Sequence, residues 1–247
     1  MIKSLTATLN KNRPIVDIEL KDSTVLWRYL DTAKFLDLTH NRDLFFSRGD
    51  KFEDAYEGAF TRKIKEIIDH NYRENGIDFT ADEFAKRIRE KVFVNCWHRN
   101  TNDSMAMWHI YGQSSAAMAI TTTVGMLRDS MIEANLPFRW AIKKVRYVNH
   151  WRNPEIDIRP YSNIFSYKLK AYEFEKEVRV IVDRSQEFDI DIAENGMKIG
   201  VSLEKLLRSI VISPTAPSWF FELISATTEK YGVLTPVRRS KLTFGPK

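Results

Sequence analysis

The chain has 247 residues and a net charge of +5, with 43% hydrophobic and 12% aromatic residues. That length fits one large domain or two small ones, and the apolar fraction is sufficient for a real core. The sequence has no apolar run long enough for a transmembrane helix, its N-terminus lacks the apolar stretch of a signal peptide, and its one cysteine, Cys96, excludes an internal disulfide framework. We therefore expect a cytoplasmic protein with no membrane contact, and one Cys with five scattered His does not favour a structural zinc site.

The positive charge is concentrated between residues 139 and 170, where aromatic residues are interleaved with basic ones. The basic residues are Arg139, Lys143, Lys144, Arg146, Arg152, Arg159, Lys168 and Lys170, against two acids, Glu155 and Asp157. The aromatic residues are Trp140, Tyr147, Trp151, Tyr161, Phe165 and Tyr167. This pattern predicts a polyanionic or phosphorylated partner, and a nucleic acid is one such partner.

The first predicted strand covers residues 24–30 (TVLWRYL) and follows a polar lead-in over residues 1–23, which holds a short strand at 15–20. Period-two alternation places Arg28 between Leu26 and Leu30 on a face that otherwise suits a core. A buried arginine needs an anionic partner, so we expect Arg28 to bind one.

The rest of the chain alternates irregularly between short strands and helices. Helix starts are marked by Asp31 or Thr32 and by a capping box from Thr80 to Glu83, and we interpret residues 60–91 as a helical insertion with solvated faces. The further predicted strands are 43–48, 92–98, 116–123, 140–151, 172–182, 199–202, 209–213 and 234–237, and the predicted helices are 32–38, 60–72, 80–91, 104–112, 124–134, 161–171 and 218–231. This order indicates an α+β protein, a single mixed-sheet domain over residues 1–247 with flanking helices.

The strand at 172–182 (YEFEKEVRVIV) organises the predicted site. Alternate valines face a core, whereas Glu175, Glu177 and Arg179 share the opposite face. Two adjacent carboxylates repel each other unless a positive group joins them, which here is Arg179, a ligand or a metal ion. A solvent-facing strand with a paired Glu and Arg is the simpler alternative.

An acidic loop at 49–58 (GDKFEDAYEG) has two interpretations. Its carboxylates, together with Glu175 and Glu177, could gather around Mg²⁺ as in a metal nuclease. Acids at a helix start are also favoured by the helix dipole, and this second interpretation is preferred. The loop carboxylates are Asp50, Glu53, Asp54 and Glu57.

Two pairs of side chains near the middle of the chain also have alternatives. Cys96 and His98 lie on one strand face, where a buried core cysteine is favoured over a nucleophile. Trp108 and Tyr111 are three residues apart on a short predicted helix, hence on one face. Such a pair is usually core, but it can also stack a flat ring such as a base or a nicotinamide.

Five short motifs between residues 24 and 182 resemble those of a known family. They are LWRYL (26–30), LFFS (44–47), DKFED (50–54) with Glu57, MWHIYG (107–112) and FEKEVR (174–179). Together they resemble the bacterial domain of unknown function 2971 (DUF2971) family, whose activity is unassigned. That resemblance implies little about the fold or the chemistry.

A more distant resemblance is to ADP-ribosyltransferases of the arginine type, where an Arg on a first strand, a Ser-rich strand and a Glu-x-Glu strand follow in order. Arg28, Ser47 and Glu175-x-Glu177 occur in that order here. The resemblance implies an ADP-ribosyltransferase-like fold in which Arg28 holds the pyrophosphate of NAD and Ser47 braces the nicotinamide. Glu177 would bind a ribose hydroxyl and stabilise an oxocarbenium-like transition state.

The same resemblance implies that Glu175 orients or deprotonates the acceptor, that Trp108 or Tyr111 stacks on the nicotinamide, and that Arg179 belongs to the cofactor-binding set. The Ser-Thr-Ser run of that superfamily is absent after Phe46. The run Thr121-Thr122-Thr123 is an alternative counterpart of Ser47.

We therefore expect an NAD-consuming ADP-ribosyltransferase-like enzyme or glycohydrolase, used as a bacterial toxin or anti-phage defence effector, with NAD as its substrate. One alternative is a nucleic-acid-binding or metal-dependent nuclease effector that uses residues 139–170. The other is a non-catalytic domain that senses a nucleotide in the same pocket.

Overall fold

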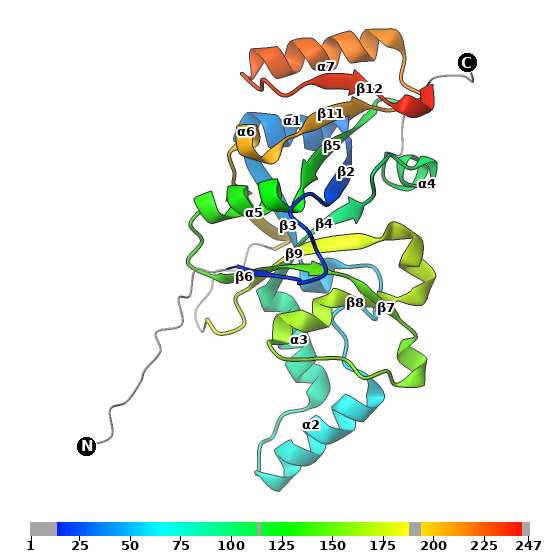
Figure 1. Ribbon diagram of the computed structural model, residues 1–247. Helices are drawn as coiled ribbons and strands as arrows, with labels where there is room; N and C mark the ends of the chain where they lie inside the picture. Colours follow the sequence, from blue (N-terminus) through cyan, green and yellow to red (C-terminus); the bar gives the residue numbers. More distant parts are fainter. Residues whose placement is uncertain (1–13, 113–114, 188–193, 244–247) are drawn as a thin grey trace.

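The computed structural model describes residues 14–112, 115–187 and 194–243, so residues 1–13 of the predicted lead-in lie outside the described residues (Figure 1). Its centre is a ten-stranded mixed sheet in the order β1-β6-β9-β4-β2-β5-β11-β12, with β3 joined to β4 and β10 joined to β3. The strands are β1 (Ile15–Val16), β2 (Val25–Asp31), β3 (Asp43–Arg48), β4 (Val92–Arg99), β5 (Ala117–Thr123), β6 (Arg139–Lys144), β9 (Glu177–Asp183), β10 (Gly196–Gly200), β11 (Ser209–Ile212) and β12 (Val237–Arg239). The pairs β1–β6 and β11–β12 are parallel and the other pairs are antiparallel, which confirms the predicted mixed sheet with flanking helices.

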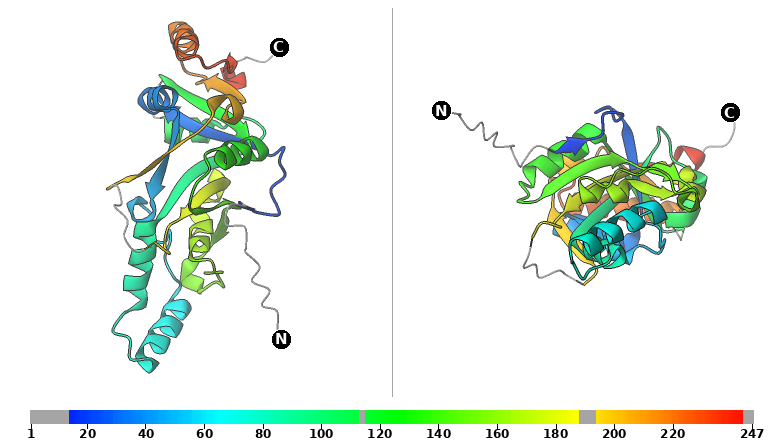
Figure 2. Two further views of the ribbon diagram at one scale, coloured as in Figure 1. Left: turned by 90° about the vertical axis from the view of Figure 1, so that its left-hand side faces the viewer. Right: turned by 90° about the horizontal axis from the view of Figure 1, so that it is seen from below.

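The helices flank this sheet and extend the molecule at both ends. Helix α7 lies at one end and the α2–α3 hairpin at the other, so the molecule is elongated (Figures 1 and 2). The helices are α1 (Thr32–Asn41), α2 (Arg62–Glu74), α3 (Ala81–Lys91), α4 (Met105–Met107), α5 (Val124–Glu133), α6 (Leu203–Leu206) and α7 (Ser218–Lys230). The predicted caps hold: Asp31 accepts from the Lys34 amide, and Thr80 and Glu83 form the capping box.

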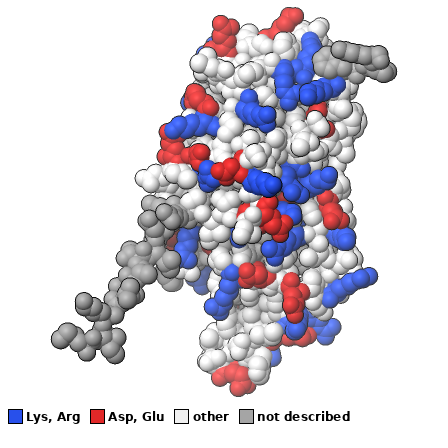
Figure 3. All heavy atoms as spheres, in the orientation of Figure 1, with Lys and Arg blue, Asp and Glu red and all other residues white. Residues whose placement is uncertain are grey.

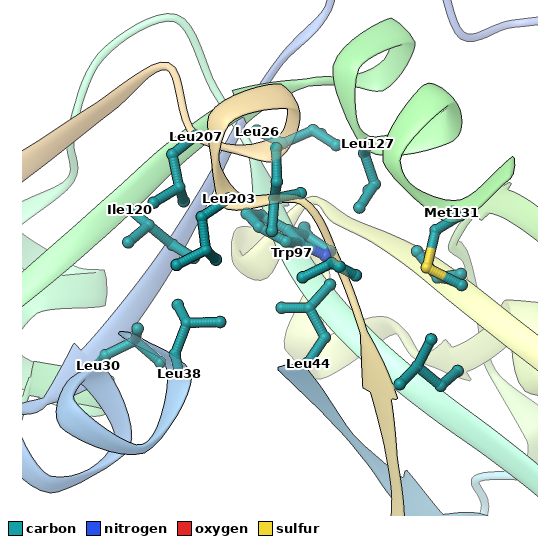
Figure 4. Close-up of a cluster of buried hydrophobic side chains, with 14 of the residues drawn as sticks. Leu26, Leu30, Leu38, Leu44, Trp97, Ile120, Leu127, Met131, Leu203 and Leu207 are labelled. Atoms are coloured by element: carbon teal, nitrogen blue, oxygen red, sulfur yellow. The ribbon is translucent and has the colours of Figure 1, made fainter. Parts of the chain in front are cut away.

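The main core packs α1, α5, α6 and α7 onto one face of the sheet. Trp97 lies in its middle, among Leu26, Leu44, Ile120 and Leu127 (Figure 4). The alternate valines of β9 are part of this core, as their spacing predicted. A smaller core covers the opposite face between α3 and the segment around Phe165.

The strand β4 is the point where the sheet forks. It pairs with β3 at Phe93 and Val94, and with β2 at His98 and Arg99. Between these positions, residues 95–97 have ladder partners only on β9 among the described residues. Because β2 and β3 diverge along the same edge of β4, the sheet opens there.

Some predicted elements differ from the structure. The predicted helix at 161–171 is wrong: it is the 3-10 helix η4 (Tyr161–Ser166), strand β8 (Tyr167–Leu169) and the start of the 3-10 helix η5 (Lys170–Glu175). Residues 162–168 are all buried, so packing from several sides overrides the local helix preference. The predicted strand at 140–151 breaks into β6, β7 (Arg146–Val148) and the 3-10 helix η3 (His150–Arg152), and the last strand begins at Val237.

Candidate functional site

A cavity of about 720 Å³ lies at the fork of the sheet, and strands β2, β3, β4 and β9 all contribute to it. Loop 51–57, η5 and the π-helical turn η2 (Trp108–Gly112) complete its walls. A cavity of this size falls in the range of small-molecule sites.

Five of the seven predicted site residues line this one cavity. They are Arg28, Ser47, Tyr111, Glu175 and Glu177. The structure therefore brings together side chains that are up to 149 positions apart, from Arg28 to Glu177. Trp108 and Arg179 are buried behind the wall and are not among the lining residues.

The two glutamates meet at a buried lysine that sequence reasoning missed. Lys168 Nζ lies 2.5 Å from Glu175 Oε2, 2.9 Å from Glu177 Oε1 and 3.3 Å from Glu57 Oε1. The centroid of the Tyr172 ring lies 4.6 Å from Lys168 Nζ. Lys168, which the sequence predicted on a helix, is thus the positive group that joins the carboxylates. The sequence signal for such a group was the pair of adjacent acids, which needs a cation beside it.

Arg179 completes this buried ionic cluster from the strand β9. Its Nε lies 2.5 Å from Glu177 Oε2, and its Nη1 lies 2.7 Å from Glu57 Oε2 and donates to the Phe165 carbonyl at 2.9 Å. The predicted Glu–Arg pair is therefore present, but the solvent-facing alternative is wrong, because Arg179 has no exposed surface and Glu177 is 6% exposed.

The backbone before β9 explains why both glutamates point inward. The predicted strand begins only at Glu177: Glu175 ends η5, and Lys176 adopts a left-handed conformation with φ 45°. His98 Nδ1 donates to the Glu175 carbonyl at 2.5 Å, and the Glu177 amide donates to Tyr147 Oη at 2.7 Å. These contacts fix the bend and hold the two carboxylates side by side.

The two carboxyls have different acidities. Burial, together with the neighbouring Glu177, raises the pKa of Glu175 to about 7. Glu177 is itself buried, but the charges of Arg179 and Lys168 hold its pKa well below the ordinary range. One carboxyl is thus ionised at neutral pH while its neighbour can take up or release a proton, an arrangement typical of acid–base sites.

Tyr111 and Lys168 help to maintain the different protonation of Glu175 and Glu177. Tyr111 Oη donates to Glu175 Oε1 at 2.6 Å, and burial raises the pKa of the Tyr111 phenol, so it remains a donor. The pKa of Lys168 is raised because the attraction of Glu177 and Glu57 outweighs the effect of burial. Lys168 is therefore charged throughout the physiological range.

Arg28 faces the cavity without a carboxylate partner. Among residues 14–112, 115–187 and 194–243 it forms no ion pair; its Nη2 is 3.5 Å from the Phe45 carbonyl oxygen and its buried Nη1 has no hydrogen-bond partner. Its guanidinium lies 6.0 Å from the Trp97 ring centroid, and burial lowers its pKa to about 10. The expected anionic partner of Arg28 is not supplied by the described part of the chain.

The predicted stacking pair is separated by the π-helical turn. Trp108 packs edge-on against Tyr29 at 4.8 Å and donates through Nε1 to Asp103 at 3.2 Å, whereas Tyr111 is 40% exposed in the cavity. The prediction that both share one face is wrong, because the wider i→i+5 turn spreads side chains that an α-helix would align.

Cys96 and His98 both line the cavity. Burial raises the pKa of the Cys96 thiol, so the group is neutral and poorly nucleophilic at neutral pH. Burial lowers the pKa of His98, and its Nδ1 must carry the proton that the Glu175 carbonyl accepts.

Two carboxylates of the acidic loop pair with basic side chains of the protein. Glu57 joins the ionic cluster, and Asp50 instead pairs with Arg48 at 2.6 Å. The described residues contain no group of three or more His, Cys, Asp or Glu side chains that could hold a metal ion. The loop itself is packed tightly, since a Cβ on Gly49 or Gly58 would meet the Phe165 ring at 2.4 or 2.7 Å.

The basic segment 139–170 contributes only part of its aromatic residues to the core. Trp140, Phe165 and Tyr167 are buried, and Lys168 belongs to the ionic cluster. Trp151 is exposed, but Lys and Arg are interspersed with Asp and Glu over the face shown in Figure 3. Tyr147, Trp151 and Tyr161 keep exposed surface, so a nucleic-acid partner for this segment stays a prediction.

The threonine run is not among the residues that line the cavity. Thr121 and Thr122 are buried on β5, where Thr121 Oγ1 bonds Ser209 Oγ at 2.7 Å, and Thr123 caps α5. Ser47, by contrast, lines the cavity.

Comparisons with known proteins add little to this geometry. No family model and no curated protein matches the chain, so membership of the DUF2971 family stays a prediction. Among solved structures, the chain is similar to Thermus sp. 2.9 DarT in complex with ADP-ribosylated ssDNA, with a TM-score of 0.41 and 9% identity over 93% of this chain and 97% of that one.

Within the described ranges, no helix is long and apolar enough to cross a bilayer.

Proposed function

We propose that the cavity binds NAD and cleaves its nicotinamide–ribose bond, in the manner of ADP-ribosyltransferases and NAD glycohydrolases. One observation carries this proposal: Arg28, Ser47, Glu175 and Glu177 line a single cavity although they come from four elements. Their chemistry suits the substrate, since an unpaired guanidinium binds a pyrophosphate and an ionised carboxylate stabilises a cationic ribosyl transition state.

Each residue has a distinct role in this proposal. Arg28 pairs with the pyrophosphate, and Ser47 contacts the nicotinamide ribose side. Glu177 remains ionised because Arg179 and Lys168 hold its pKa low, so it can face the developing oxocarbenium ion as an anion. Tyr111, half-exposed in the cavity, supplies an aromatic face for the nicotinamide.

The test is mass spectrometry of NAD incubated with the purified chain and a cell lysate. Wild type should release nicotinamide, and Glu177→Gln should reduce release by roughly 10²–10³-fold, as expected when a group that stabilises transition-state charge is lost. Glu204→Gln is the matched control, since Glu204 pairs with Arg42 on the surface far outside the cavity.

Circular dichroism of each variant separates a catalytic loss from unfolding, because Glu177 also binds Lys168 and Arg179. If folded wild type releases no nicotinamide, the proposal is wrong. Thermal stabilisation by NAD without any product would instead favour the nucleotide-sensing alternative. A role as a toxin or anti-phage defence effector stays a prediction until NAD cleavage is measured.

A further inference from the structure

We infer that the acceptor at this site is water, so that the product is free ADP-ribose and the enzyme is an NAD glycohydrolase. This inference rests on the proposed NAD cleavage and adds the identity of the nucleophile. Three features of the cavity carry it: the burial of the carboxylate pair, the cation beside it, and the open acceptor positions on Glu175.

The first feature is burial. Glu175 is 3% exposed and Glu177 is 6% exposed, and Tyr111 reaches across the cavity to Glu175 Oε1. A side chain of a folded protein acceptor would need to bring its nucleophilic atom within hydrogen-bond distance of one of these carboxylates. So little accessible surface favours a water molecule over the side chain of a macromolecule.

The second feature is the charge next to Glu175. Lys168 Nζ is 2.5 Å from Glu175 Oε2 and remains protonated. A guanidinium or ammonium acceptor placed at Glu175 would lie close to this charge in a buried site, where like-charge repulsion is strong. Glu57 and Glu177 share this lysine, so the repulsion disfavours a cationic acceptor at Glu175 and favours an uncharged one.

The third feature is the unused hydrogen-bonding capacity of Glu175. Each of its oxygens has one side-chain donor, Tyr111 on Oε1 and Lys168 on Oε2. A carboxylate offers about four acceptor positions, so positions remain for the proton of a water molecule. A pKa raised to about 7 makes this carboxyl a base that is available near neutral pH.

The reaction balances with these parts. The bond between the ribose C1′ and the pyridinium nitrogen breaks, and its electron pair leaves with neutral nicotinamide. The water oxygen bonds to C1′, its proton passes to Glu175, and Glu175 then releases that proton to solvent. The sum is NAD⁺ and water giving ADP-ribose, nicotinamide and a proton.

Several charged or titratable groups surround Glu175 and set its titration. They come from the elements packed against it. They are Lys168 on β8, Tyr111 on η2, Glu177 on β9, His98 on β4, Tyr147 on β7 and Glu57 on the loop that precedes α2.

The experiment incubates the purified full chain with NAD in buffer, without and with agmatine as a small guanidinium acceptor, and quantifies products by mass spectrometry. Free ADP-ribose equal in amount to nicotinamide, with no ADP-ribosyl-agmatine, supports the inference. Nicotinamide release that requires a lysate, with ADP-ribose attached to a macromolecule, overturns it and leaves NAD cleavage intact. No nicotinamide under any condition overturns both.

The pH profile then tests the role of Glu175. In wild type, kcat/KM should rise as the pH increases through about 7, and Glu175→Gln should lower it by roughly 10²-fold and abolish that rise. A retained rise in Glu175→Gln would show that Glu175 is not the base. Glu204→Gln serves as the control and should reproduce the wild-type profile.

A second variant, Tyr111→Phe, tests the role of Glu175 even if Glu175→Gln does not fold. Tyr111→Phe removes the donor on Oε1, which helps to lower the pKa of Glu175. Its profile should therefore shift to higher pH than that of wild type. An unshifted profile in folded Tyr111→Phe would contradict the inference.

Discussion

Arg28 and Arg179 both lie on central strands beside the same cavity, but their surroundings are opposite. Arg179 is fully buried and paired with Glu177 and Glu57, which raise its pKa. Arg28 has no carboxylate within reach among the described residues, and burial lowers its pKa to about 10. The first arginine is paired within the protein, whereas the second has no ion-pair partner among the described residues.

The two arginines therefore have different effects on the stability of the protein. A buried ion pair contributes little net stability, but losing one partner leaves an uncompensated buried charge. Arg179 therefore has to stay paired with the glutamates, and this pairing fixes their positions. An unpaired, partly buried guanidinium costs stability in the free protein and recovers it when an anion binds. Both arginines can be tested by the same substitution.

The largest expected effect comes from Arg179→Met, which removes the partner of Glu57 and Glu177 inside the protein. The free energy of unfolding should fall by about 3–5 kcal/mol, as measured by urea denaturation. Arg42→Met, which breaks a surface pair, is the control. A loss below about 1 kcal/mol would show that the cluster does not hold the site together.

Arg28→Met should affect ligand binding more than stability, in contrast with Arg179→Met. Without ligand, the free energy of unfolding should stay the same or rise, because an unpaired charge is removed. Binding of ADP-ribose should weaken by about 1.5–3 kcal/mol, the contribution of hydrogen bonds to a charged group. Differential scanning fluorimetry with and without ADP-ribose measures both, and strong destabilisation of the free variant would contradict this view of Arg28.

The pH dependence of stability sharpens the comparison at Glu175. Its pKa is raised from 4.5 in the unfolded chain to about 7 in the folded protein, so the folded state holds the proton more tightly. The stabilisation is complete below pH 4.5 and is lost as the pH rises towards 7. Wild type should therefore lose on the order of 1 kcal/mol of unfolding free energy relative to Glu175→Gln over this range.

The depressed pKa of Glu177 has the reverse effect, and that effect falls at lower pH, outside this window. Urea unfolding at a series of pH values measures the difference between wild type and Glu175→Gln. Parallel stability curves for the two proteins would mean that Glu175 does not titrate in this range.

The smallest effect is expected for Glu204→Gln, whose partner Arg42 lies on the surface. Exposed ion pairs contribute between zero and about 1 kcal/mol, so the unfolding midpoint should barely change. A larger loss would weaken the contrast between paired charges inside the cavity and those outside it.

Sequence alone determined the regular parts of this protein. Alternation defined the faces of β2 and the core face of β9, and capping residues located the starts of α1 and α3, because local spacing and local hydrogen bonds encode these features. It also selected Arg28, Ser47, Glu175 and Glu177, as unusual polar residues on core-like strands or through their resemblance to known motifs.

Only the tertiary structure decided what those residues meet. Lys168 lies on a short strand and Glu57 on a loop, and neither segment has helical or strand periodicity of its own. Trp108 lies outside the cavity because its turn is π-helical. The fork at β4, which creates the cavity, depends on pairings between strands distant in sequence. Such contacts are set by packing across the whole chain, so no local pattern could predict which charges would be paired and which left free.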